Sequence, residues 1–167
     1  MHPRINFYKA APEAIQALRG LEHYINQSSG LEPSLRELIK TRASQINGCA
    51  YCIDMHTKDA RAAGETEQRI YALNAWRDTP FYTDRERAAL EWTEAVTLIA
   101  EGHVPDDLFF RVREEFNEAE LVNLTLAITA INAWNRFAIA FRSPPGTYQP
   151  SGLRSASIVG TSSETVG

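Results

Sequence analysis

The sequence lacks long apolar runs, a surplus of basic residues and the pattern of a secretory leader. Its longest apolar stretches fall well short of the roughly 18 residues that a membrane span needs. The formal net charge is −4 and no basic stripe stands out, which argues against nucleic acid or an anionic membrane surface as a partner. Residues 1–11 do not combine a charged start with an apolar stretch. We therefore expect a cytoplasmic protein that binds neither membrane nor nucleic acid.

Cysteine is also scarce. The 167 residues include only two, Cys49 and Cys52, which are separated by Ala50 and Tyr51. A bridge that closes so small a ring restricts the unfolded chain very little, so it would be a poor structural disulfide for a domain of this size. Structural disulfides are rare in a reducing cytosol, where a close cysteine pair is typical of redox or metal-binding sites.

No stretch alternates β-branched and polar residues for long enough to predict a sheet, and helical periodicity dominates instead. With 44% hydrophobic residues, a chain of this length can bury the core of one domain. A capping signal at Thr83–Glu86 and breakers at Gly30, Gly48 and Gly64 set helix limits. The fold class is therefore all-α, with helices at about 11–28, 33–47, 49–63, 66–75, 84–99, 105–116 and 118–141.

The composition changes sharply at the end of the last helix. Pro144-Pro145-Gly146 and a Ser/Thr/Gly-rich end follow Ser143, and they include too few apolar residues for a core of their own. We expect residues 1–143 to form the helical domain. Residues 144–167 are expected to be a flexible Pro/Ser/Gly-rich C-terminal tail, or one that is ordered only against a neighbouring subunit.

The two cysteines follow the breaker Asn47-Gly48 and should occupy the first turn of a new helix. A helix N-terminus favours thiolates because it presents unpaired N–H groups and a partial positive charge. Residues three and four apart share a helix face, so Cys49, Cys52 and His56 should line one stripe. His56 can take or relay a thiol proton near neutral pH.

Glu37 lies on the preceding expected helix, twelve residues before Cys49. Two helices joined by a tight turn pack against one another, so Glu37 can lie beside the cysteine helix on its buried side. A carboxylate there could orient His56 or act directly as the base. Alone, amid Arg36 and Lys40, the same residue would be an ordinary solvated acid.

Zinc is the alternative reading of this cluster, because Cys49, Cys52 and His56 could supply three ligands. The sequence has no second cysteine pair, however, and the remaining histidines, His2, His23 and His103, are not spaced as ligands to this trio. We therefore expect thiol redox chemistry and no metal.

Taken together, these residues resemble the alkylhydroperoxidase AhpD-like core of the carboxymuconolactone decarboxylase family. The family pattern is a Glu, eleven residues, Cys-x-x-Cys, three residues and a His, followed by Ala and Gly at the helix end. In this sequence the pattern falls on Glu37, Cys49, Cys52 and His56, with Ala60, Ala63 and Gly64. Residues 42–52 and 131–136 are also similar to the family, and the resemblance covers roughly residues 10–143.

The resemblance implies an AhpD-like helical bundle that reduces hydroperoxides and forms a Cys49–Cys52 disulfide. It implies that Cys52 is the peroxidatic thiol, that Cys49 is the resolving and more exposed thiol, and that Glu37 and His56 relay the proton. An external dithiol or thiol protein would reduce the disulfide again, and no other cofactor is implied. The sequence departs from the well-studied peroxidases at Tyr51, where they carry a second histidine. A phenol, with a pKa near 10, is a poor proton relay at neutral pH.

The family also forms homo-oligomers, and the helix expected at 118–141 supports the same expectation. Phe137, Ile139 and Phe141 lie away from its main apolar stripe, and exposed apolar patches usually mark subunit contacts. We expect a hexamer built from dimers or trimers.

Two further functions stay open at this point. One is a carboxymuconolactone decarboxylase-like lyase that acts on a small lactone acid, although the true decarboxylases lack the cysteine pair. The other is a non-enzymatic redox sensor whose disulfide changes its assembly. Peroxide-dependent turnover with a dithiol donor would separate the peroxidase from both.

Overall fold

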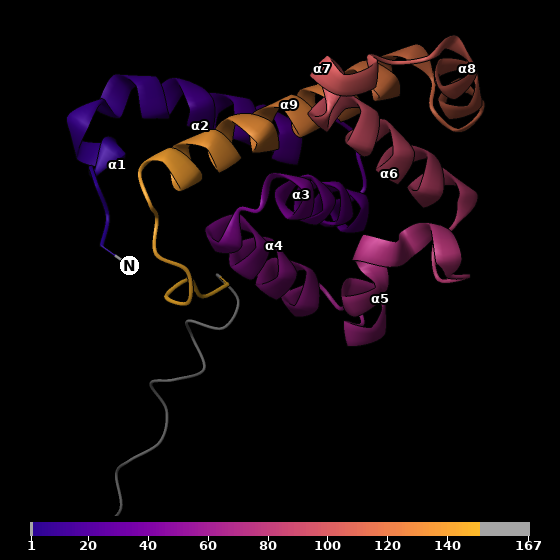
Figure 1. Ribbon diagram of the computed structural model, residues 1–167. Coiled ribbons are helices and arrows are strands. Elements are labelled where there is room, and N and C mark those ends of the chain that lie inside the picture. The colour runs from indigo at the N-terminus through magenta and orange to yellow at the C-terminus, as the bar shows by residue number, and fades with distance from the viewer. Residues whose placement is uncertain (1, 151–167) are drawn as a thin grey trace, which may run out of the picture.

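The computed structural model describes residues 2–150, and in this range the fold is a bundle of helices without strands (Figure 1). This confirms the expected all-α fold. The elements, in chain order, are α1 (Phe7–Ala10), α2 (Pro12–Gln27), α3 (Pro33–Asn47), α4 (Ala50–Ala62), α5 (Glu67–Ala72), the 3-10 helix η1 (Leu73–Asp78), α6 (Asp84–Thr97), α7 (Ile99–Gly102), α8 (Asp106–Glu115) and α9 (Glu118–Ala140).

Prolines and capping residues mark the starts of the longer helices. Pro12 and Pro33 stand in the first turns of α2 and α3, where the missing N–H costs nothing. Thr83 and Asn117 form capping boxes at the starts of α6 and α9, with their side chains bonded to the backbone three residues on. The periodic segments were therefore predicted closely. The four-residue helices α1 and α7 were not, because each is only about one helical turn long.

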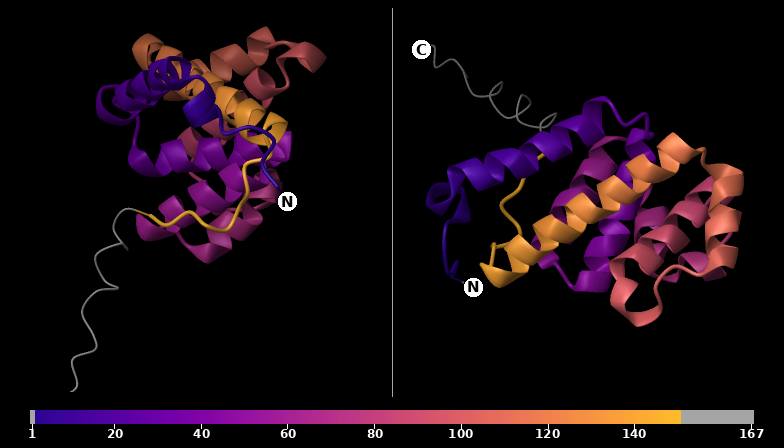
Figure 2. Two further views of the ribbon diagram at one scale, coloured as in Figure 1. Left: turned by 90° about the vertical axis from the view of Figure 1, so that its left-hand side faces the viewer. Right: turned by 90° about the horizontal axis from the view of Figure 1, so that it is seen from above.

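Helix α3 lies at the centre of the bundle and packs against α4, α6 and α9 (Figure 1). Helix α2 runs along α9, as the view from above shows (Figure 2). The largest buried cluster joins α3, α6, α8 and α9 around residues such as Ile39, Val112, Phe116 and Leu124. A smaller cluster, which contains both cysteines, lies between α3, α4 and α9.

The N-terminal segment of the chain packs against the C-terminal end of α9. The Arg4 N–H donates to the Phe141 carbonyl (3.0 Å), and the Phe7 ring packs against the rings of Phe137 and Phe141. Phe137 and Phe141 are therefore partly buried within the chain, which corrects our expectation that both contribute to an exposed patch. Ile139 does stay exposed, at 46%.

Residues 144–150, the first part of the expected tail, lie against α4. The Gly146 N–H donates to Asp54 Oδ2 (3.0 Å), and Lys58 Nζ donates to the Tyr148 carbonyl (3.1 Å). Residues 151–167 lie outside the described residues, so the division of the chain at residue 143 stays a prediction.

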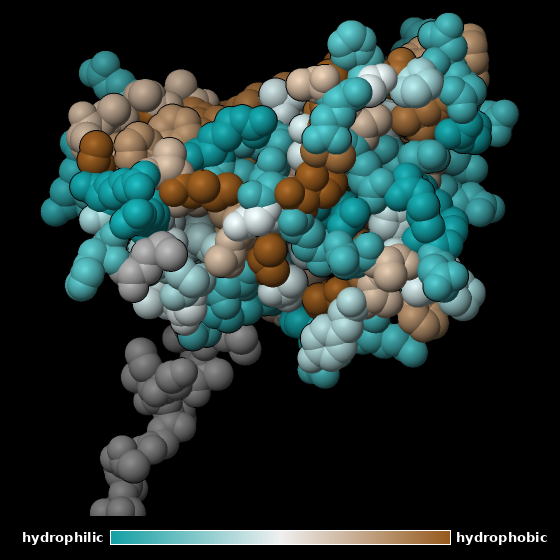
Figure 3. All heavy atoms as spheres, in the orientation of Figure 1, coloured by the Kyte–Doolittle hydropathy of each residue, from teal (hydrophilic) through white to brown (hydrophobic). Residues whose placement is uncertain are grey.

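Hydrophobic side chains stand among hydrophilic ones on the face shown in Figure 3 and do not cover it. Within residues 2–150, no helix has the length and apolar character needed to cross a membrane.

Candidate active site at the cysteine pair

The turn between α3 and α4 places the cysteines. Helix α3 ends at Gly48, whose φ of 68° lies in the left-handed region that glycine adopts without a steric penalty. Cys49 follows as the N-cap of α4, and its Sγ accepts a hydrogen bond from the Cys52 N–H (3.4 Å). The chain thus reverses within two residues, and α4 packs back along α3.

Cys49 and Cys52 form a disulfide at the start of α4, with Cα atoms 5.4 Å apart. The structure therefore places both residues in the first turn of one helix and within bonding reach, as their spacing predicted. Each cysteine is only 1% exposed, among Ala43, Ile131 and Ala138.

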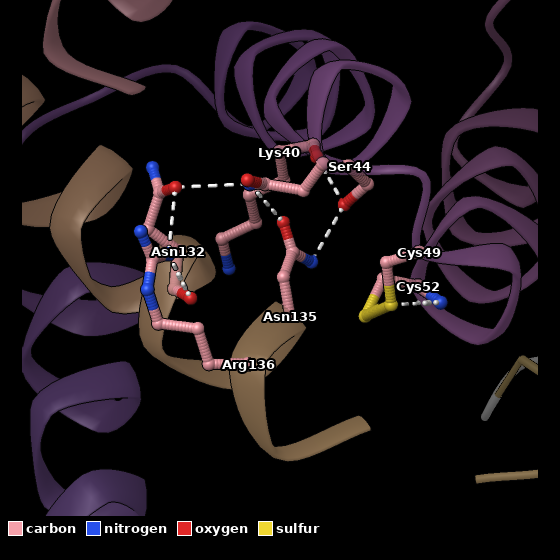
Figure 4. Close-up of a disulfide and its surroundings, with 8 residues drawn as sticks. Lys40, Ser44, Cys49, Cys52, Asn132, Asn135 and Arg136 are labelled. Atoms are coloured by element: carbon pink, nitrogen blue, oxygen red, sulfur yellow. Dashed lines mark hydrogen bonds between the residues drawn. A yellow bond between two sulfur atoms is a disulfide. The ribbon is translucent and has the colours of Figure 1, made fainter. Parts of the chain in front are cut away.

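A network of amide side chains connects α9 with the end of α3 beside the disulfide (Figure 4). Asn135 Nδ2 donates to Ser44 Oγ (3.0 Å), and Asn47 Nδ2 donates to the side-chain oxygens of Asn135 (2.8 Å) and Asn132 (2.9 Å). Ser44 Oγ in turn donates to the Lys40 carbonyl (2.7 Å). The two asparagines of the family-like segment 131–136 therefore fix the turn that carries the cysteines, a role that the sequence did not reveal.

Glu37 and His56 form a hydrogen-bonded pair across the contact between α3 and α4. His56 Nδ1 lies 2.8 Å from Glu37 Oε2, and His56 is buried. Burial alone would raise the pKa of Glu37, but the hydrogen bond and charge of His56, with help from Lys40 and Arg36, lower that pKa below its ordinary value of 4.5. Glu37 thus approaches the cysteine helix as expected, whereas its catalytic role stays a prediction.

A cavity of about 270 Å³ lies between α1, α2, α4 and α9, and Cys52 and His56 are in its wall. His56 follows Cys52 by one helical turn, which puts the two side chains on one face of α4. The rest of the wall combines apolar residues such as Phe7, Met55 and Trp134 with charged and polar ones. Cys52 and His56 therefore border the same cavity.

Cys49 does not line this cavity, although the sequence favoured it as the more accessible thiol. The expectation was wrong because Cys49 is the N-cap of α4, so its sulfur turns over the first helical turn toward the Cys52 N–H. Cys49 and Cys52 are equally buried in the disulfide form.

Asp59 and Tyr148 also belong to the site, and neither was predicted. Asp59 lines the same cavity, and both of its carboxylate oxygens accept from the Tyr148 hydroxyl, at 2.7 and 2.9 Å. Burial and the nearby charge of Glu37 raise the pKa of Asp59, and the Tyr148 hydrogen bond opposes this rise. Asp59 could have been found from its position three residues after His56, on the same helix face. Tyr148 gave no signal because it lies in the expected tail.

The zinc alternative requires both cysteines as thiolates. Both cysteine sulfurs are used in the disulfide, so neither is a free thiolate in this state. Glu37, His56 and Asp59 do bring oxygen and nitrogen atoms within 4.8 Å of one another. Glu37 bonds to His56 and Asp59 bonds to Tyr148, so each of the three side chains has a hydrogen-bond partner within the chain.

Tyr51, where related peroxidases carry a histidine, also lines the cavity. Burial raises the pKa of Tyr51 further, with smaller contributions from Tyr8 and Asp54. The phenol therefore stays protonated at neutral pH, so it can donate a hydrogen bond but cannot readily carry a proton away.

The fold and the site together define an all-helical protein of the AhpD-like class, centred on a Cys-x-x-Cys disulfide. The carboxymuconolactone decarboxylase family matches residues 11–95, and the chain belongs to this family.

Similar proteins and structures agree with this assignment. The uncharacterized protein YdfG of Bacillus subtilis is 53% identical over 140 residues, which cover 84% of this chain and 95% of YdfG. The crystal structure of ATU0492 from Agrobacterium tumefaciens, a protein of unknown function provisionally assigned to antioxidant defence as AhpD, has a TM-score of 0.84 and 52% identity. The match covers 88% of this chain and 100% of ATU0492. An AhpD-core, peroxidase-related protein from Ralstonia eutropha JMP134 shares the fold, with a TM-score of 0.74 at 20% identity over 84% of this chain and 74% of its own.

Proposed function

We propose that this protein is a thiol-dependent peroxidase that reduces hydroperoxides through the Cys49–Cys52 pair. One observation carries the proposal: Cys52, in the first turn of α4, shares a cavity wall with His56, and His56 bonds to Glu37. This arrangement supplies a nucleophile, a base and a group that orients the base.

The reaction begins with the reduced dithiol. His56 takes the proton of Cys52, and the thiolate attacks the terminal oxygen of the hydroperoxide. The S–O bond forms as the O–O bond breaks, and the leaving alkoxide takes a proton to become an alcohol.

Cys49 then completes the oxidation. Its sulfur attacks the sulfenic acid of Cys52, the disulfide forms, and the hydroxide that leaves takes the Cys49 proton to become water. The sum is two thiols and one hydroperoxide converted to one disulfide, one alcohol and one water. An external dithiol or thiol protein supplies the two electrons that return the pair to the reduced form.

The setting that we propose for this activity is the cytoplasm, with the chain assembled as a homo-oligomer. Apolar side chains exposed on α8 and α9, including Phe110 at 65% and Val122 at 67%, support a subunit contact there. A hexamer stays the expected assembly.

The proposal is tested by hydroperoxide consumption with dithiothreitol as the electron donor. The wild-type chain should consume tert-butyl hydroperoxide in proportion to dithiothreitol oxidised, and Cys52→Ser should not. Equal consumption by both chains, or none by the wild type, would reject the peroxidase function. The redox-sensor alternative would then be favoured by a dithiol-dependent change in assembly.

A further inference from the structure

The Glu37–His56 pair stands between two separate cavities. His56 lines the cavity of about 270 Å³ that contains Cys52, and Glu37 does not. Glu37 lines another cavity, of about 340 Å³, in which neither His56 nor Cys52 takes part. The hydrogen bond between the two side chains therefore joins the walls of the two cavities.

The second cavity opens to solvent between the start of α3 and the end of α4. Three small residues, Ala60, Ala63 and Gly64, line it together with Glu37. Its outer residues Ser34 and Thr83 are exposed. A water molecule occupies about 30 Å³ in the liquid, so this cavity has room for several.

At the rim of the second cavity, the charged side chains pair with one another and not with Glu37. Arg69 bonds to Glu65 (2.9 Å) and to Glu86 (2.5 Å). The Glu37 carboxylate instead bonds through Oε2 to His56, and its side chain keeps 18% of its surface exposed. The exposed part of Glu37 is thus available to water in the cavity that it lines.

We propose that the second cavity is the route by which the His56–Glu37 pair exchanges protons with solvent, and that it admits small carboxylates as well as water. The role of the route in peroxide reduction rests on the proposed function. The Cys52 proton passes to one ring nitrogen of His56, the proton on Nδ1 passes to Glu37 Oε2, and water in the second cavity receives it. No electrons move in this step, and the net change is loss of the thiol proton to solvent.

The two cavities would then have different roles: the first holds the substrate, and the second exchanges protons with solvent. A hydroperoxide in the first cavity displaces water from Cys52 and His56, which would block proton exchange through that opening. Glu37 keeps its contact with solvent on the other side, so the base can be reset while substrate or product is still bound.

Chemical rescue tests this route. In the Cys49→Ser background Cys52 is the sole thiol, and its alkylation rate with iodoacetamide reports its thiolate fraction. Glu37→Ala should lower this rate about tenfold at neutral pH, equivalent to about one unit in the Cys52 pKa. Formate should enter the space left by the carboxylate, restore a partner to His56 and return the rate in proportion to its concentration.

Filling the cavity should remove the rescue. In the Glu37→Ala background, we expect Ala63→Leu at the C-cap of α4 and Ser34→Phe in α3 each to abolish the effect of formate. Ala62→Leu is the matched control, because Ala62 is adjacent to Ala63 but lines a different groove. It should leave the rescue unchanged.

Three results would overturn the proposal: equal rescue in the filled variants, no rescue in Glu37→Ala, or no rate loss in Glu37→Ala. Hydroperoxide consumption by the wild type is measured in parallel. If the formate pattern holds while no hydroperoxide is consumed, the proton route stands and the peroxidase function fails. Normal consumption without the formate pattern rejects the route and leaves the peroxidase function standing.

Discussion

His56 Nδ1 lies 2.8 Å from Glu37 Oε2, so the two helices that reverse at Gly48 share a polar contact at the wall of the cysteine cavity. The same contact fixes the orientation of the imidazole one turn beyond Cys52. Cys52 and His56 also line one cavity, which Cys49 does not line.

We predict an asymmetric response of the two cysteines to peroxide. Cys49→Ser should accumulate sulfenic acid at Cys52, because Cys52 faces the cavity with His56 and the resolving thiol is gone. Cys52→Ser should react far more slowly. Mass spectrometry after a peroxide pulse, with dimedone to trap sulfenic acid, measures both. Sulfenic acid on Cys49 instead would reverse the assignment.

Replacing Glu37 should change how the stability of the protein depends on pH. The pKa of Glu37 is below 4.5 in the folded chain, so the folded state holds this proton less tightly than the unfolded state. The pair therefore contributes stability above a pH of about 4.5, and this contribution is lost as the pH falls through the lowered pKa. At neutral pH, Glu37→Gln should lower the free energy of unfolding by about 2 kcal/mol, typical of a hydrogen bond to a charged group.

Urea denaturation of wild type and Glu37→Gln across the acidic range tests this. The two curves should approach one another as the pH falls. A difference that stays constant with pH would mean that the Glu37 charge is not responsible.

Asn135→Ala should weaken the turn that carries the cysteines. Asn135 is fully buried, and its loss removes its hydrogen bonds to Ser44 and Asn47, each of which keeps one other partner. The expected cost is about 0.5–1.5 kcal/mol of unfolding free energy per hydrogen bond lost. Asn123→Ala is the control on the same helix, because Asn123 is less buried and bonds to the Ser29 carbonyl away from the cysteines.

The asparagine variants also separate a local effect on the site from general destabilisation. Asn135→Ala should change the alkylation rate of the reduced cysteines, and Asn123→Ala should not. Equal rates in both variants would show that the amide network stabilises the fold without positioning the thiols.

The proposed homo-oligomer is predicted to have a mass several times that of the 18.7 kDa chain in light scattering at micromolar concentration. Val122→Asp should weaken assembly, because it places a charge on an exposed apolar part of α9. Exposed Ile5→Asp, near the N-terminus, is the comparison and should leave the mass unchanged. A wild-type mass near that of one chain would reject the oligomer.

The sequence predicted the elements whose periodicity spans several turns, and it predicted the cluster whose residues are close in sequence or repeat a family spacing. Helix α9 was expected at about 118–141 and runs from Glu118 to Ala140. The Glu37–His56 contact followed from one tight turn between two helices. Helical periodicity determines the first of these, and the second, between residues 19 apart, also needs the turn at Gly48.

Helical periodicity and family spacing did not predict the long-range contacts. Tyr148 meets Asp59 only because residues 144–150 return along α4, and Phe137 and Phe141 are partly buried only because α1 folds over the end of α9. The exposure of Cys49 was misjudged for a related reason. Its position at a helix start was foreseen, but the direction of its sulfur depends on the cap geometry.

The cavity beside Cys52 is built from both ends of the described chain. Phe7 contributes from α1, Ala138 from α9 and Ser143 from the segment that follows α9, and the Arg4 N–H bonds to the Phe141 carbonyl. During synthesis, Glu37, the cysteines and His56 emerge long before the residues that close the cavity around them. A nascent or C-terminally shortened chain therefore carries the reactive thiols without their enclosure, and the complete cavity forms only when the first and last helices meet.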